Sequence, residues 1–138
     1  MLADPGGGGV NNAGAAFAGI GTAIGGIVTA ADSGGFGISH DGGQALTKAI
    51  DELMIAVGNA LTDSAMLTKE PALGTTPAAT VYKPFLATVA SDPVQGAIPA
   101  LTKLHGDLIN ARAAIQKAMQ NFQANEHTIM SSAKTIQA

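Results

Sequence analysis

The chain has no cysteine and no tryptophan, and only 12% of its residues are charged. Without cysteine it can form neither a disulfide framework nor a thiolate metal site. Its seven Lys and Arg are scattered along 138 residues. The concentrated basic face that phosphate binding needs is therefore missing. The sequence predicts no nucleic-acid partner and no disulfide-stapled fold.

Catalytic and metal-binding patterns are also missing. His40, His105 and His127 lack the spacing to one another, or to carboxylates, that places ligands on one helix face. Asp51 and Glu52 are adjacent on a predicted helix, so their side chains diverge by roughly 100° and do not converge as an acid and a base. No serine sits in a nucleophile elbow, and no phosphate-binding fingerprint follows the N-terminal glycines. We therefore expect no enzyme activity, no metal and no cofactor.

Residues 1–38 form a Gly- and Ala-rich N-terminal extension, for which the sequence predicts either a flexible segment or a short helix. Residues 13–31 carry no charge and approach the length that spans a bilayer, so membrane contact is one interpretation. The first Lys is Lys48, and we expect no cleavable general secretory signal peptide. Apolar residues at helical spacing and a close-packing glycine pair mark this segment: Phe17, Ile20, Gly21, Ile24, Gly25 and Ile27.

Residues 39–138 predict an all-α domain, a long antiparallel helical hairpin of the coiled-coil kind. The first helix is expected over residues 41–68, with Asp41 as its N-cap and Pro71 after its end. Its polar residues fall mostly opposite an apolar seam, which includes Leu46, Ile50, Leu53 and Val57.

Residues 69–93 are rich in proline and predict a long connection that contains a short helix, with Pro84 in or near its first turn. The second long helix is expected over residues 94–136, where apolar residues recur every seven positions. At about 1.5 Å per residue this helix outreaches the first, so its C-terminal end needs cover from elsewhere, such as a second chain. Its seam includes Leu101, Leu104, Leu108, Ile115, Phe122 and Ile129.

Two short elements carry a family resemblance. Phe122-Gln-Ala-Asn-Glu126, late in the second helix, matches an aromatic-x-x-x-acid pattern with Phe in place of Tyr, and Leu73-Gly74 lies at the bend. With these elements, residues 36–136 resemble the small Trp-X-Gly (WXG, ESAT-like) substrates of type VII secretion, which are paired-helix proteins exported as folded dimers. The chain departs from that family in having no Trp at the bend and in its long connection and N-terminal extension.

The resemblance implies a secreted or cell-surface protein that pairs with itself or with a sister helical-hairpin protein. It also implies contact with the type VII secretion ATPase, with Phe122 and Glu126 as the export motif. Two other interpretations stay open. In the first, the chain is a subunit of a helical filament or needle-like assembly. In the second, it is a membrane-active secreted protein that uses residues 13–31.

Overall fold

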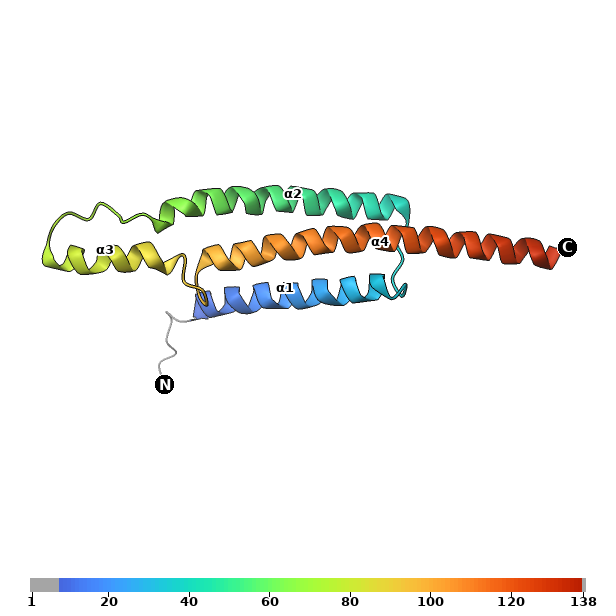
Figure 1. Cartoon of the computed structure of the whole chain (residues 1–138), viewed down its shortest axis with the longest axis horizontal. Helices are drawn as coiled ribbons and strands as arrows, with labels where there is room; N and C mark the ends of the chain where they lie inside the picture. Colours follow the sequence, from blue (N-terminus) through green and yellow to red (C-terminus); the bar gives the residue numbers. More distant parts are fainter. Residues whose placement is uncertain (1–7, 138) are drawn as a thin grey trace. The chain divides into compact units, whose positions relative to one another are not determined.

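The computed structural model describes the backbone of residues 8–137 and the side chains of residues 15–137. No strand is present among these residues, and the all-α prediction is confirmed. The elements follow one another along the chain as α1 (Gly8–Asp32), α2 (His40–Ser64), the 3-10 helix η1 (Ala65–Thr68), α3 (Pro77–Val89) and α4 (Ala97–Gln137) (Figure 1).

The N-terminal extension is helical over Gly8–Asp32, which makes α1 25 residues long and longer than the predicted short helix. No proline interrupts this stretch, and its many alanines offset the low helix propensity of its glycines. Residues 1–7, which the sequence places in the same extension, lie outside the described residues.

The predicted N-cap of α2 is wrong. The Oγ of Ser39 accepts a hydrogen bond from the backbone N–H of Gly42 at 3.2 Å, and the helix begins at His40. Ser39 is therefore the capping residue. Asp41 lies instead in the first turn, where the positive end of the helix dipole stabilises its carboxylate.

The predicted position of Pro84 is also wrong. The Oγ1 of Thr76 caps α3 by accepting from Ala79 N at 3.2 Å, and Pro77 occupies the first turn. Pro84 lies inside the helix. The helix starts about two turns earlier than a start at Pro84 requires, because Thr76 and Pro77 together supply the cap and the preset backbone angle.

The chain divides into two compact units, each made of segments that are distant in sequence. The first unit consists of Met1–Gly21 and Ile55–Gly106, and the second of Thr22–Met54 and Asp107–Ala138.

In the first unit, η1 packs against α3, and a tight turn leads from α3 into α4. Asp92 Oδ1 accepts hydrogen bonds from Val94 N at 2.9 Å and from Gln95 N at 2.8 Å. Gly96 N then donates to the carbonyl oxygen of Asp92 at 2.8 Å. A Cβ at Gly96 would lie 2.5 Å from the carbonyl oxygens of Ala90 and Asp92, so only glycine fits this turn without a backbone shift.

In the second unit, the beginning of α2 lies against α4. Gly43 is buried and comes so close to the side chain of Met119 that a Cβ there would overlap it. Asp51, two turns further along α2, pairs with Arg112, with 2.7 Å between Oδ1 and Nε. Residue numbers rise along α2 as they fall along α4, so the two segments run in opposite directions within this unit.

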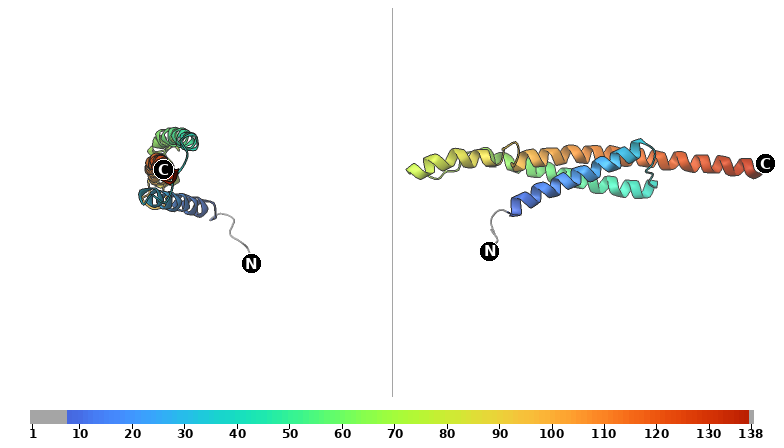
Figure 2. Two further views of the ribbon diagram at one scale, coloured as in Figure 1. Left: turned by 90° about the vertical axis from the view of Figure 1, so that its right-hand side faces the viewer. Right: turned by 90° about the horizontal axis from the view of Figure 1, so that it is seen from below.

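The loop before α2 also contacts α4. Ile38 N donates a hydrogen bond to the carbonyl oxygen of Ala118 at 3.1 Å, and the backbone of Gly37 lies beside Phe122. Beyond Phe122, α4 continues past the other segments of the second unit, and residues 123–137 are all exposed (Figure 2). The apolar residues that α4 buries in this unit are Leu108, Ala111, Ala114, Ile115 and Ala118.

Candidate functional site: exposed apolar helix faces

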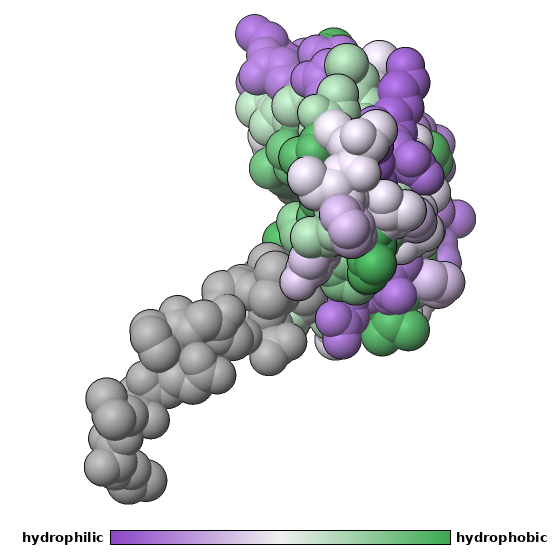
Figure 3. All heavy atoms as spheres, turned by 90° about the vertical axis from the view of Figure 1, so that its left-hand side faces the viewer, coloured by the Kyte–Doolittle hydropathy of each residue, from purple (hydrophilic) through white to green (hydrophobic). Residues whose placement is uncertain are grey.

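Helix α3 turns its large apolar side chains outward. Val81 is 72% exposed and Phe85 is 61% exposed, and the other large side chains of this helix are exposed as well. Isolated apolar residues are common on protein surfaces, whereas a contiguous set is typical of an interaction site. Figure 3 shows hydrophobic residues lying open among hydrophilic ones on the side from which α3 is seen end-on. We call the following residues the α3 face: Val81, Tyr82, Phe85, Leu86 and Val89.

The opposite side of α3 carries smaller residues. Ala79 is buried, and Ala87 and Ala90 are half-buried. Lys83, the one charged residue within Pro77–Val89, is also half-buried and lies on this side. The helix thus has its amphipathic pattern inverted: alanines point inward, and aromatic and branched side chains meet solvent.

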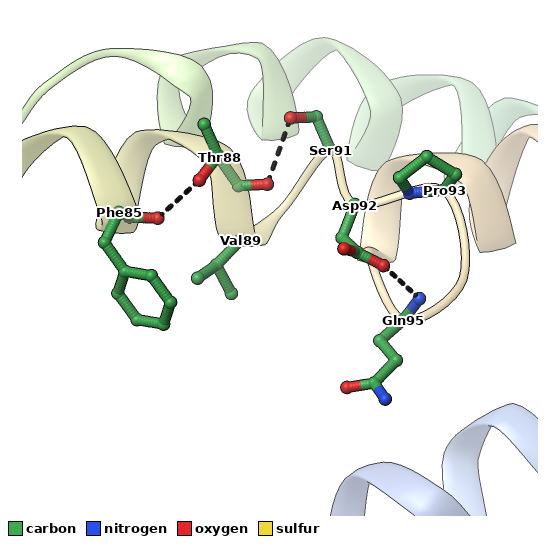
Figure 4. Close-up of a pocket in the computed structure, with 7 residues that line it drawn as sticks. All are labelled: Phe85, Thr88, Val89, Ser91, Asp92, Pro93 and Gln95. Carbon is green, nitrogen blue, oxygen red and sulfur yellow. Dashed lines mark hydrogen bonds between the residues drawn. The ribbon is translucent and has the colours of Figure 1, made fainter.

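Two open cavities border the α3 face. The first has a volume of about 540 Å³ and is lined by residues from Phe85 to Gln95, including Thr88, Val89 and Asp92. Figure 4 shows the side chains of Phe85 and Val89 projecting to the same side of the helix. The second, about 690 Å³, is mainly apolar and lies among η1, α3 and the start of α4, with Val89 also in its lining. Its lining includes Met66, Leu67, Pro71, Leu86, Ala90 and Ala97, with Lys69, Glu70 and Gln95 as the polar members.

Asp92 lines the first cavity and accepts two backbone hydrogen bonds in the turn beside it. The backbone hydrogen bond from Gln95 and then that from Val94 lower the pKa of its carboxyl below the ordinary value of 3.8. The carboxylate is therefore charged at neutral pH and holds the turn that closes one side of the cavity.

The C-terminal end of α4 exposes a second set of apolar residues. Ile129 is 67% exposed and Ile136 is 85% exposed, and Met130 is exposed beside them. Ile129 and Ile136 continue the seven-residue spacing of Ile115 and Phe122. The repeat that is covered near Ile115 is thus uncovered over residues 123–137.

The predicted export-motif residues lie where this cover ends. Phe122 is half-buried beside the backbone of Gly37, and Glu126 is exposed one turn further along α4. The side chains are four residues apart, so they lie on neighbouring turns of the same side of the helix.

The other predicted seam residues differ in burial. Val57, Leu104, Leu108 and Ile115 are buried, Ile50 and Leu101 are half-buried, and Leu46 and Leu53 are exposed. The predicted bend residues lie in the irregular segment between η1 and α3, where Leu73 is exposed and Gly74 has a φ of 83°. This left-handed backbone conformation explains the glycine at position 74.

The predicted membrane segment lies on α1. Within the described residues, Ala15–Asp32 is long and apolar enough to cross a membrane, a criterion that core helices and signal sequences also meet. Only Ala31 of this stretch is buried. The candidate residues are exposed at Ile20, Gly25 and Ile27, and half-buried at Phe17, Gly21 and Ile24.

The sequence analysis missed Asn121, which joins three segments of the second unit. Its Nδ2 donates to the carbonyl oxygen of Ala31 at 2.8 Å and to that of Phe36 at 2.9 Å. It thereby satisfies a carbonyl at the end of α1 and another in the following loop. The sequence signal available was an amide directly beside the heptad residue Phe122.

The pair of Arg112 and Asp51 was also missed, because the two residues are 61 positions apart. The hydrogen bond from Arg112 to Asp51, with the attraction between their charges, raises the pKa of the guanidinium above its ordinary value. Both side chains are about 40% exposed, at 40% and 44%, so the pair orients the helices more than it stabilises them.

Over residues 15–137, no group of three His, Asp or Glu side chains is placed to hold a metal ion. Comparisons with protein families, with curated proteins and with solved structures returned no match.

Proposed function

We propose that the chain is an exported helical protein, a type VII secretion substrate or its secreted partner, that acts by pairing its helices with itself or with a sister chain. The observation that carries this proposal is the exposure of large apolar side chains on α3 and at the end of α4. Burying such surface contributes roughly 25 cal/mol per Å². A partner helix that covers either face is therefore stabilised without any charged anchor.

The export part of the proposal rests on Phe122 and Glu126. A secretion machine that reads an aromatic ring and a carboxylate one turn apart finds both near the end of α4, with Glu126 open to solvent. The exposed residues that follow leave room for a receptor beside this turn.

Export is tested by measuring the chain in the culture medium of a bacterium with a type VII secretion system. Glu126→Gln removes the charge at nearly constant volume, and we expect much less chain in the medium at an equal level inside the cells. Asp63→Asn is the matched control, because it makes the same change on an exposed position of α2. Equal secretion of both variants would contradict the role of Glu126.

Phe122 needs a subtler substitution, because it also packs beside Gly37. Phe122→Tyr keeps the ring and introduces the residue typical of the resembled family, so we expect export to persist. Phe122→Leu keeps an apolar side chain without the ring, and we expect export to fall. Equal export of the Leu and Tyr variants would mean that the ring is not recognised.

A second candidate function, insertion into a membrane, is favoured by the exposed apolar side chains of Ala15–Asp32. In a liposome flotation test of the full chain, Ile20→Lys should reduce binding because a charge in the hydrocarbon region costs several kcal/mol. Ile109→Lys, at a similarly exposed position of α4, is the control. Absence of flotation by the unmodified chain would exclude this function.

A further inference from the structure

The α3 face has a symmetry that the helix-pairing proposal does not require. Val81, Phe85 and Val89 are four residues apart and form one row along the exposed side of the helix. The row reads the same from either end, with a valine one turn before and one turn after the phenylalanine. Such a row matches a second copy of itself when the two helices run in opposite directions.

We propose that two copies of this chain associate through their α3 faces, antiparallel and about a two-fold axis at Phe85. Phe85 then packs on Phe85 of the second copy, and Val81 packs on Val89 of the second copy. A contact of this kind is isologous, since the same patch serves both chains and the assembly closes at two. The proposal deepens the proposed function by naming the partner and the surface, and it rests on that function.

Charge favours a second copy over a charged partner. The only charged residue within Pro77–Val89 is Lys83, which lies away from the α3 face and is half-buried. Two α3 faces therefore meet without repulsion between like charges. A partner selected by charge would find no charged side chain on this face to select it.

The two cavities beside the row give the flanking side chains of a second copy a place to lie. Tyr82 lies one turn before Leu86 on the same side of the row, so in the antiparallel arrangement Tyr82 of the second copy lies beside Leu86, which lines the cavity of about 690 Å³. Thr88 lines the cavity of about 540 Å³ on the other side of the row, where Thr88 of the second copy also lies. In packed helix pairs, side-chain ridges of one helix lie in grooves of the other.

The chain has no cysteine, so single introduced cysteines report the pairing directly. Two thiols can be bridged only where their Cβ atoms come within about 4 Å. Under mild oxidation, we expect Phe85→Cys to give covalent dimers. A mixture of tagged Val81→Cys with untagged Val89→Cys should give the mixed dimer in excess over either self-dimer, with Phe85 intact in both chains. Thr80→Cys, on another side of α3, is the control and should stay monomeric.

A second variant measures affinity instead of proximity. Phe85→Glu places two carboxylates at the axis and should raise the dimer dissociation constant at least about tenfold, as expected for a central aromatic anchor. Thr80→Glu adds the same charge outside the face and should change it less than about twofold. Circular dichroism of both variants checks that the helices persist.

The outcomes separate this inference from the proposed function. Self-dimers of Val81→Cys and of Val89→Cys in excess over the mixed dimer would indicate parallel pairing and overturn the inference. A dimer by light scattering that links through Ile129→Cys instead, and is insensitive to Phe85→Glu, would overturn it while leaving helix pairing intact. A chain that stays monomeric at every concentration would overturn the inference and leave pairing with a sister chain as the remaining form of the proposed function.

Discussion

At the residue scale, Asn121 links segments that are distant in the sequence through side-chain hydrogen bonds. Its amide donates two hydrogen bonds to backbone carbonyls from the end of α1 and the loop that follows. A carbonyl left without a donor when partly buried destabilises the fold. One side chain thus holds three segments of the second unit together.

We predict that Asn121→Ala lowers the free energy of unfolding by about 1–3 kcal/mol, because the Phe36 carbonyl loses the amide donor and the Ala31 carbonyl keeps only the backbone N–H of Gly34. Asn121→Asp should cost at least as much, since a carboxylate faces the same two oxygens and has no hydrogen to donate. Denaturant unfolding followed by circular dichroism measures the change. Asn125→Ala, one turn on and exposed, should stay within about 0.5 kcal/mol; an equal loss in the two alanine variants would contradict this role.

Thr47, unlike Asn121, has a buried polar atom, its Oγ1, that makes no hydrogen bond within the described residues. Thr47→Val replaces the hydroxyl by a methyl group of similar shape, and we predict a gain of up to about 1 kcal/mol in the free energy of unfolding. Thr62→Val is the comparison, because the Oγ1 of Thr62 is exposed and donates to Gly58. A loss at Thr47 as large as that at Thr62 would refute the prediction.

The hydrogen bonds of Asn121 and the buried hydroxyl of Thr47 could not be predicted from the sequence. The role of Asn121 depends on where the carbonyls of Ala31 and Phe36 lie after a loop has folded, 85 to 90 positions away in the chain. Local patterns carry no such information. Ser39 and Thr76, by contrast, are of the residue types preferred at helix N-caps, so the starts of α2 and α3 were predictable from the sequence.

At the element scale, the turn between α3 and α4 depends on a glycine and on a carboxylate. Gly96→Ala should destabilise the first unit by about 1–3 kcal/mol, because the added Cβ meets backbone atoms that cannot move cheaply. Gly106→Ala is the matched control inside α4, where a Cβ meets no neighbour within 4 Å. It should stabilise the chain by about 0.5–1 kcal/mol. A Gly96→Ala variant that is more stable than the unmodified chain would contradict the turn geometry.

The same turn should respond to acid. The folded-state pKa of Asp92 is lowered, so its contribution is fully present above the ordinary value of 3.8 and is lost as the pH falls through the folded-state pKa. We predict that the amide resonances of Val94 and Gln95 shift together below about pH 4 in NMR spectra. Asp92→Asn keeps an acceptor that does not titrate, and the shift should vanish; its persistence would assign the titration to another group.

The long helices were predictable as elements because heptad spacing and prolines mark them. Predicted bounds of 94–136 compare with Ala97–Gln137 for α4, and 41–68 with His40–Thr68 for α2 with η1. The orientation of α3 was not predictable. Its sequence has a clear apolar face, and burying that face is the ordinary expectation, whereas the structure places Ala79 and Ala90 inward and Phe85 outward.

At the scale of the whole molecule, the exposed apolar faces predict a stability that depends on concentration. Association of the folded chain adds to its apparent stability by mass action. The midpoint of thermal unfolding should therefore rise with protein concentration for the unmodified chain and rise less for Phe85→Glu. Differential scanning calorimetry over a hundredfold range measures it. A midpoint independent of concentration in both chains would show that neither is associated in that range.

The most direct test of helix pairing is the molar mass of the purified full chain in solution, measured by light scattering after size exclusion over a hundredfold concentration range. One chain has a mass of 13.6 kDa. We predict a rise from one chain to two, with a plateau at two. Continued growth beyond two chains would instead favour the filament interpretation. A mass that stays at one chain throughout would contradict self-pairing and leave a sister chain as the only helix partner.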